Sequence, residues 1–210
     1  LTPDEFIAYC ARVSNPGNQN NTGTAQKLIN YLIRNEHWSP FEMVHVAMEI
    51  VTTRDIGRQI LRHRSFSFQE FSQRYAEVVD FVPGRETRFQ DSKNRQNSIS
   101  IDDLGGNDTM TPSMIDEEWR ATQADFASQA ALFYKRALQQ GIAKEQARAL
   151  LPEGLTMSKL YMAGTLRSWL HYVKLRASHG TQKEHMDIAI KARDILVKEF
   201  PSCEEYLLND

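Results

Sequence analysis

Apolar residues recur at helical spacing over much of the chain. Thr2 and Pro3 suit the start of a helix over 3–13, and a second helix over 25–35 follows Thr24 as its N-cap. The apolar stripes of these helices consist of Phe6, Ile7, Cys10 and Val13 and of Leu28, Tyr31 and Leu32. The same periodicity predicts a helix over 52–64 with Thr53 as its cap and a long helix over 112–141 closed by Gly141 in the C′ role. It also predicts helices over 143–152, 165–176 and 181–200 and a short one over 201–210.

Two other stretches are typical of strands. After the break at Ser39-Pro40, apolar and other residues alternate over 44–51, as in a half-buried strand, and residues 155–164 form a second candidate. Residues 84–112 are polar, contain glycine and predict a long loop or hairpin. Without a repeat or a clear boundary, we expect one α+β domain over 1–210, helix-rich with a small, mainly antiparallel sheet.

The composition bounds the function. The chain has 210 residues, 41% of them apolar, and a net charge of −2, which favours a globular protein over a general nucleic-acid or membrane binder. No apolar run reaches the length of a membrane span. The two cysteines, Cys10 and Cys203, form no CxxC pair or zinc spacing, so we expect a reducing, cytoplasmic compartment and no metal.

The segment RHRSFSFQEFSQRY, residues 62–75, combines features that neither a core segment nor a solvated loop normally has. Its arginines, with Arg58 one helical turn earlier, concentrate positive charge without a run of acids, as a phosphate clamp requires. Its phenylalanines offer flat walls, and Gln69 and Glu70 can bind amide or imide edges. Together they suit a nucleotide or a flavin. A solvated helix end explains the cations equally well, and core packing is the alternative for the aromatics.

The same segment resembles the signature of the flavin-dependent thymidylate synthases, in which R-H-R is followed by a serine, an acidic or amide residue and S-x-R-Y. Three further blocks match that family in order: HWSPFEM, ARALLPEG and LRSWLHYVKLRAS with the following TQKE. The resemblance implies a homotetramer that binds FAD at its subunit interfaces. Its reaction converts dUMP to dTMP, with methylenetetrahydrofolate as carbon donor and FAD, reduced by NADPH, as hydride source. Such an enzyme is both a methyltransferase and an oxidoreductase.

Individual roles follow from the resemblance. The FAD contacts are Ser39, Arg62, His63, Arg64, Glu70, Thr165, Arg167 and His171, with His37 facing the flavin and the folate or nicotinamide path. The dUMP contacts are Gln59, Arg62, Glu70, Ser72, Arg74, Arg148 and Arg176. Many members carry Asn where this chain has Thr165, and His179 is offset by one from the family's histidine. The expected catalytic residue is Arg176, whose guanidinium at the uracil edge stabilises charge developing on the ring.

Two other function classes remain open. Arginine and aromatic clusters also bind single-stranded nucleic acid, although such a protein is expected to carry a basic domain charge. A non-catalytic nucleotide sensor needs the phosphate arginines but has no use for His37, Arg64 or Arg167. Neither cysteine is a good nucleophile, since Cys10 lies on an apolar stripe and Cys203 is followed by two glutamates. This absence favours a flavin route over a thiol route.

Overall fold

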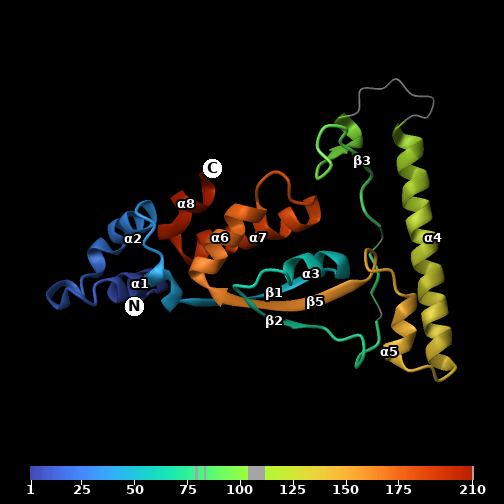
Figure 1. The fold of residues 1–210 in the computed structure, drawn as a ribbon, viewed down its shortest axis with the longest axis horizontal. Coiled ribbons are helices and arrows are strands. Elements are labelled where there is room, and N and C mark those ends of the chain that lie inside the picture. The colour runs from blue at the N-terminus through green and yellow to red at the C-terminus, as the bar shows by residue number, and fades with distance from the viewer. Residues whose placement is uncertain (79, 83, 104–111, 210) are drawn as a thin grey trace. The chain divides into compact units, whose positions relative to one another are not determined.

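The computed structural model describes residues 1–78, 80–82, 84–103 and 112–209 (Figure 1). Its α-helices are α1 (Pro3–Ala11), α2 (Ala25–Arg34), α3 (Arg54–Ile60), α4 (Pro112–Gln139), α5 (Lys144–Ala147), α6 (Leu166–Arg176), α7 (Lys183–Glu199) and α8 (Glu204–Leu208). Its strands are β1 (His45–Thr53), β2 (Ser67–Glu70), β3 (Arg88–Gln90), β4 (Ser98–Ser100) and β5 (Met157–Thr165). No helix in these ranges is long and apolar enough to cross a membrane.

The chain forms two compact units. The first consists of 1–48, 63–68 and 161–210, and the second of 49–62 and 69–160. Strands β1, β2 and β5 each contribute residues to both units. The expected single domain over 1–210 stays a prediction.

Strands β1, β5 and β2 form one sheet in that order, and β3 with β4 forms another. Two flanking hydrogen bonds show that β1 and β5 are antiparallel: Arg54 N donates to Thr156 O, and Leu166 N donates to Val44 O. Strands β3 and β4 pair antiparallel as a hairpin within 84–112, the segment expected to form a long loop or hairpin, of which 104–111 lie outside the described residues. The helix-rich α+β class with small antiparallel sheets is therefore confirmed.

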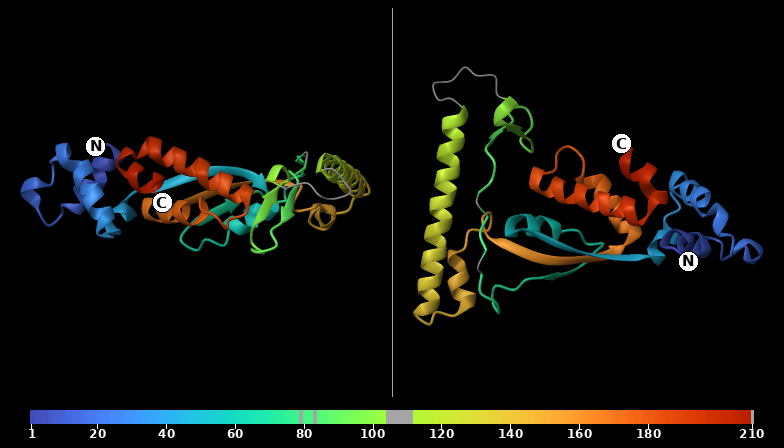
Figure 2. Two further views of the ribbon diagram at one scale, coloured as in Figure 1. Left: turned by 90° about the horizontal axis from the view of Figure 1, so that it is seen from above. Right: turned by 180° about the vertical axis from the view of Figure 1, so that it is seen from behind.

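The first unit is built from two helix pairs, α1 with α2 and α6 with α7, and Figure 2 shows the second pair side by side in both views. Helix α1 begins as its sequence predicts. Thr2 Oγ1 accepts from Glu5 N at 3.2 Å, and the Glu5 carboxylate accepts from Thr2 N at 2.7 Å, which satisfies two backbone donors at the helix start. The core of this unit includes Ile7, Ile29, Phe41, Leu166, Leu170 and Leu196.

In the second unit, α4 packs against α5. The packed cluster consists of Val78, Tyr134, Ala137, Ala147 and Leu151, with Phe81 and Leu138 at its edge. Helix α4 is followed by Gly141 in the left-handed conformation (φ +82°), the C′ role that the sequence predicts.

Two expected N-caps are wrong. Helix α2 starts at the predicted position, but Thr24 makes no cap and instead accepts from Arg12 Nη2 at 2.8 Å. Thr53 makes no cap for α3 either, because its hydroxyl accepts from Arg85 Nη2 at 3.0 Å. In both cases an arginine from elsewhere in the same unit takes the oxygen that the helix start was expected to use.

Other helical expectations need correction. Helix α3 ends at Ile60, so Arg58 and Arg62 do not share one helical face, because the chain turns at residues 61–62 on its way into β2. The helix expected over 143–152 shortens to α5 and a 3₁₀ turn over Arg148–Leu150. Tyr31 is exposed rather than on the buried stripe of α2.

Candidate functional site

The segment after α3 brings His63 against the last residue of α6. Arg176 Nε donates a hydrogen bond to His63 Nε2 at 3.0 Å, across 113 positions of sequence. A guanidinium nitrogen is only a donor, so this bond requires a lone pair on Nε2. The ring of His63 is therefore neutral with its proton on Nδ1. One predicted FAD contact and the predicted catalytic arginine thus meet within the first unit.

Aromatic rings surround this contact. Phe66 packs edge-on against Trp169 and Tyr172, with ring centroids 4.9 and 5.9 Å apart, and Trp169 Nε1 donates to Val46 O at 3.0 Å. Phe66 is only 9% exposed, so core packing explains it, whereas Phe71 is 36% exposed. Phe66, the first of the phenylalanines expected to form a flat wall, is therefore part of the core.

A buried pair that the sequence did not predict lies next to His63. His185 on α7 and Tyr172 on α6 are 0% and 2% exposed, and His185 Nε2 lies 3.1 Å from Tyr172 Oη. Burial, followed by the charge of Arg176 and the charge that His63 would carry if it were protonated, lowers the pKa of His185 to about 4, so its ring is neutral at physiological pH. Burial also raises the pKa of Tyr172 well above its usual value. No motif or ligand spacing in the sequence marks this pair.

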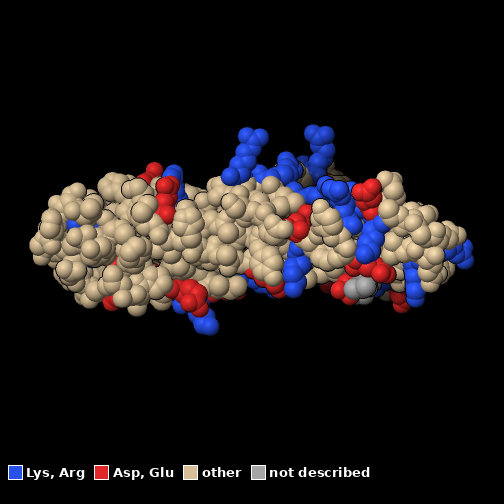
Figure 3. All heavy atoms as spheres, turned by 90° about the horizontal axis from the view of Figure 1, so that it is seen from below, with Lys and Arg blue, Asp and Glu red and all other residues tan. Residues whose placement is uncertain are grey.

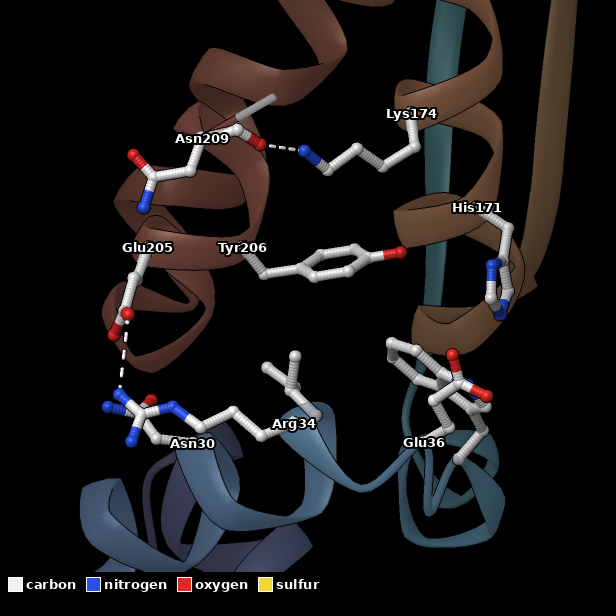
Figure 4. A pocket seen from close by; sticks show the side chains of 10 residues that line it. Asn30, Arg34, Glu36, His171, Lys174, Glu205, Tyr206 and Asn209 are labelled. Carbon is white, nitrogen blue, oxygen red and sulfur yellow. Dashed lines mark hydrogen bonds and ion pairs between the residues drawn. The ribbon is translucent and has the colours of Figure 1, made fainter.

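The first unit also contains a pocket of about 680 Å³ between α2, α6 and α8 (Figure 4). Its lining residues are Asn30, Ile33, Arg34, Glu36, Trp38, His171, Lys174, Glu205, Tyr206 and Asn209. Trp38 meets His171 and Tyr206 edge-on, at centroid distances of 4.7 and 5.4 Å. A volume of this size lies in the range of small-molecule sites.

The charges around this pocket are largely balanced. Arg34 pairs with Glu205 at 3.3 Å, and Lys174 Nζ donates to the backbone oxygen of Asn209, both drawn as dashed lines in Figure 4. Burial and the Arg167 charge lower the pKa of His171, which keeps its ring neutral. The pocket therefore offers aromatic edges and hydrogen-bonding groups rather than one strong charge.

Two other predicted FAD contacts of the first unit, Arg167 and Thr165, have local partners. Arg167 forms an ion pair with Glu42, a residue of the HWSPFEM block that sequence analysis did not select. Thr165 caps α6, accepting from Ser168 N at 3.2 Å. Ser39 is exposed at the start of a 3₁₀ turn, and the exposed ring of His37 lies edge-on to Tyr31.

In the second unit, Glu70 is held by two neighbours. Ser158 Oγ donates to Glu70 Oε1 at 3.0 Å, and Arg54 Nη1 lies 3.5 Å from the same oxygen. The side chains of Glu70 and Arg54 are only 20% and 14% exposed. This carboxylate is therefore fixed in direction, with Oε1 engaged by the protein.

Two predicted dUMP arginines meet at a common neighbour. Arg74 Nε lies 3.7 Å from the Glu145 carboxylate, and Arg148 Nε donates to the Glu145 backbone oxygen at 3.2 Å. The side chains of Arg74 and Glu145 are both more than half exposed, so their pairing is weak. Ser72 Oγ accepts from Arg74 N at 3.4 Å, and Gln59 is half-buried near the end of α3. The structure thus brings Ser72, Arg74 and Arg148 together within the second unit.

The two flanking arginines of the R-H-R motif are exposed. Arg62 is the last residue of its segment of the second unit, and Arg64 belongs to the first. Within the described ranges, neither guanidinium forms an ion pair. Two permanent cations close in sequence are therefore available to an anion.

The cysteines and histidines show no alternative chemistry in the described part of the chain. Cys203 is fully buried, and burial together with the Asp4 charge raises the pKa of its thiol to about 12. Cys10 is half-buried on α1. Among the described residues no group of three or more His, Cys, Asp or Glu side chains could hold a metal ion.

Comparisons with known proteins agree over almost the whole chain. Residues 1–202 match the family model of the thymidylate synthase complementing proteins. The chain is 49% identical over 207 residues to a probable flavin-dependent thymidylate synthase of Paramecium bursaria Chlorella virus 1, covering 98% of this chain and 91% of that protein. It is 48% identical over 202 residues to the flavin-dependent thymidylate synthase of Synechocystis, covering 96% and 88%. A crystal structure of the UMP/dUMP methylase PolB from Streptomyces cacaoi with 5-Br dUMP is similar at a TM-score of 0.80 and 29% identity, covering 97% and 89%.

Proposed function

The chain belongs to the family of thymidylate synthase complementing proteins, the flavin-dependent thymidylate synthases, and we propose that it converts dUMP to dTMP with the help of a bound flavin. The observation that carries this proposal is the hydrogen bond between Arg176 and His63. It joins the candidate catalytic residue to the central histidine of the R-H-R motif, and both residues lie in the first unit. The relatives found are enzymes of nucleotide methylation, so the nucleic-acid and sensor alternatives are not supported. Figure 3 shows basic side chains gathered over one stretch of the face that it draws, with acidic side chains beside them.

The residues around the R-H-R motif suit FAD. Arg62 and Arg64 are exposed cations that form no ion pair within the described ranges, which fits a diphosphate group. The family resemblance also assigns to the flavin Ser39, His63, Glu70, Thr165, Arg167 and His171, with His37 toward the co-substrates. FAD, reduced by NADPH, supplies the hydride of the reaction.

Arg176 is the residue we assign to catalysis. Its Nε is engaged by His63, which leaves the terminal fork of the guanidinium for a ligand. A planar cationic fork matches the uracil edge and stabilises negative charge that develops on the ring during carbon transfer. No covalent protein nucleophile is needed for this role, and the high pKa of the buried Cys203 thiol makes it unsuitable as one.

The dUMP phosphate suits the arginine pair of the second unit. Arg74 and Arg148 both approach Glu145, and the pairing of Arg74 with that carboxylate is weak because both side chains are solvated. A phosphate brings two negative charges and three acceptor oxygens, so it competes well for both guanidinia. Gln59, Arg62, Glu70 and Ser72 complete the proposed dUMP contacts.

The aromatic pocket next to His171 suits the planar rings of the flavin or of a co-substrate. Its neutral imidazole and edge-on rings favour a flat ring over a compact ion. Methylenetetrahydrofolate and NADPH are the proposed co-substrates. We also propose a homotetramer whose sites are completed at subunit interfaces, which sedimentation velocity of the FAD-loaded protein tests directly. A cytoplasmic location stays a prediction from the two cysteines.

The decisive experiment follows the visible spectrum of the FAD-loaded protein during addition of dUMP. We expect a protein-bound flavin spectrum that shifts with dUMP, followed by dTMP formation when methylenetetrahydrofolate and NADPH are present. Bound flavin without any response to dUMP contradicts the proposed substrate. Absence of bound flavin contradicts the proposal as a whole.

The Arg176→Ala variant tests the proposed chemistry. Loss of one charge-stabilising donor costs roughly 3 kcal/mol of transition-state stabilisation, or about a hundredfold in rate, while flavin content is largely retained. Arg193→Ala is the matched control, since Arg193 pairs with the adjacent Asp194 on α7. Normal dUMP turnover by Arg176→Ala excludes the proposed role.

A further inference from the structure

The buried tyrosine and histidine behind the R-H-R motif have no role in the chemistry assigned so far. Tyr172 is the seventh residue of α6 and His185 the third of α7, so the packing of these two helices brings them together. Their Oη and Nε2 atoms are 3.1 Å apart, and both side chains are almost fully removed from solvent. A buried polar pair costs free energy unless it is hydrogen-bonded, so the two side chains must keep the orientation in which Oη and Nε2 form a hydrogen bond.

Both rings border His63. The His63 ring stands edge-on to Tyr172, with centroids 5.0 Å apart and planes at 83°, and edge-on to His185 at 6.1 Å and 82°. Rotation or flipping of the His63 ring must therefore displace one of two rings that are themselves bound to each other. Nε2 of the same imidazole accepts from Arg176.

From this arrangement we propose that Tyr172 and His185 are positioning residues for Arg176, acting through the orientation and tautomer of His63. The inference rests on the proposed function, in which the free fork of Arg176 meets the uracil ring. Tyr172 and His185 hold the His63 ring so that a bare Nε2 faces Arg176. The hydrogen bond to His63 then fixes Nε of Arg176, so that the terminal nitrogens of its guanidinium stay oriented toward the uracil ring.

Chemistry explains why the tautomer matters. If the proton moves to Nε2 of His63, two donors face each other and the contact with Arg176 is lost. A protonated His185 would place a second positive charge near Arg176, whose own charge lowers the His185 pKa. In the structure both imidazole rings are neutral, and His63 accepts at Nε2. Arg176 is therefore the only full charge in this cluster of four side chains.

Two variants remove the hydrogen bond between Tyr172 and His185, and a third variant is designed to keep it. Tyr172→Phe deletes only the hydroxyl, and His185→Leu deletes the ring, while His185→Gln keeps a polar end that can reach Tyr172. Tyr134→Phe is the matched control, because Tyr134 is also 2% exposed and its hydroxyl accepts from Val78 N in the other unit. The control separates the loss of any buried tyrosine hydroxyl from the loss of this one.

Turnover per bound flavin is the first readout. We expect Tyr172→Phe and His185→Leu to lower kcat and kcat/KM for dUMP together, by about tenfold to a hundredfold, as for a misplaced catalytic group. His185→Gln restores most of this loss, and Tyr134→Phe leaves both constants unchanged. Normalising to bound flavin and to the folded fraction removes a purely structural effect.

The second readout needs no turnover. Nitrogen chemical shifts of the protein labelled with ¹⁵N-histidine report which ring nitrogen of His63 carries the proton. We expect one tautomer, bare at Nε2, in the wild type and in Tyr134→Phe, and a mixture in Tyr172→Phe and His185→Leu.

The outcomes separate this inference from the proposed function. An active wild type whose Tyr172→Phe and His185→Leu variants keep both kcat per flavin and the His63 tautomer overturns the inference alone. A change in only one of the two readouts also overturns it, since the tautomer is the proposed cause of the rate loss. A flavin-loaded wild type that never converts dUMP overturns the proposed function instead.

Discussion

Replacing Gly164 with alanine tests how tightly the signature segment packs on the sheet. Gly164 lies in β5 with a backbone conformation open to any residue, so a glycine is needed there only for space. A Cβ at this position would lie 2.6 Å from Cδ1 and 2.9 Å from Cε1 of Phe66. Carbon atoms normally pack about 3.5–4.0 Å apart, so the new methyl group overlaps the ring by roughly 1 Å.

The ring of Phe66 has little room to yield. It is 9% exposed, and Trp169 and Tyr172 meet it edge-on at 4.9 and 5.9 Å. Overpacking of this kind costs about 1–3 kcal/mol. The lower entropy of an unfolded chain with alanine offsets about 0.4–1 kcal/mol of that. The expected result of Gly164→Ala is a loss of about 1–2 kcal/mol in the free energy of unfolding.

Urea unfolding followed by circular dichroism measures this loss. For a chain of this size, 1 kcal/mol lowers the Tm by about 2–4 °C, so a thermal scan should show a clear decrease. Gly17→Ala is the control, since a Cβ there meets nothing within 4 Å, and we expect it to be neutral or slightly stabilising. The double variant Gly164→Ala/Phe66→Leu should lose about 1 kcal/mol less unfolding free energy than the sum of the two single-variant losses. A Gly164→Ala protein as stable as the wild type refutes the steric argument.

Three further predictions concern buried groups. Cys203, with its pKa raised to about 12, should react with a thiol reagent at pH 8 only after unfolding, and fast labelling of the native protein at this residue contradicts its burial. The pKa of His185 is lowered from 6.5 to about 4, so the contribution of its neutral ring to stability is complete above pH 6.5 and is lost as the pH falls toward 4. The urea midpoint of the wild type should therefore fall more between pH 7 and pH 5 than the midpoint of His185→Leu. Trp169→Phe should cost about 2–4 kcal/mol in urea unfolding, because it leaves Val46 O without its donor and creates a small cavity, and a loss under 1 kcal/mol argues against that hydrogen bond.

Features that depend on a few neighbouring residues could be predicted from the sequence. Thr2 and Glu5 are three apart, so the capping box of α1 needs nothing from the rest of the chain. Gly141 after a long periodic segment predicts the left-handed end of α4 for the same reason. The R-H-R segment and its companion blocks were enough to indicate the family, because a motif is a property of the sequence itself.

The roles of some side chains could not be predicted from the sequence, because their hydrogen-bond partners lie far away along the chain. Thr24 resembles an N-cap, yet its oxygen belongs to Arg12 once α1 packs on α2. Glu145 beside two phosphate-binding candidates carries no local signal, because its significance comes only from what packing places next to it.

His185 shows the same limit most clearly. In the sequence it is one histidine without a ligand spacing, and in the fold it is a neutral, buried partner of Tyr172 behind His63. The local sequence sets which hydrogen bonds a side chain can make within one turn of helix. Which polar groups are buried, and against which charges, is determined only when distant helices pack, because the energy of a buried group depends on every neighbour around it.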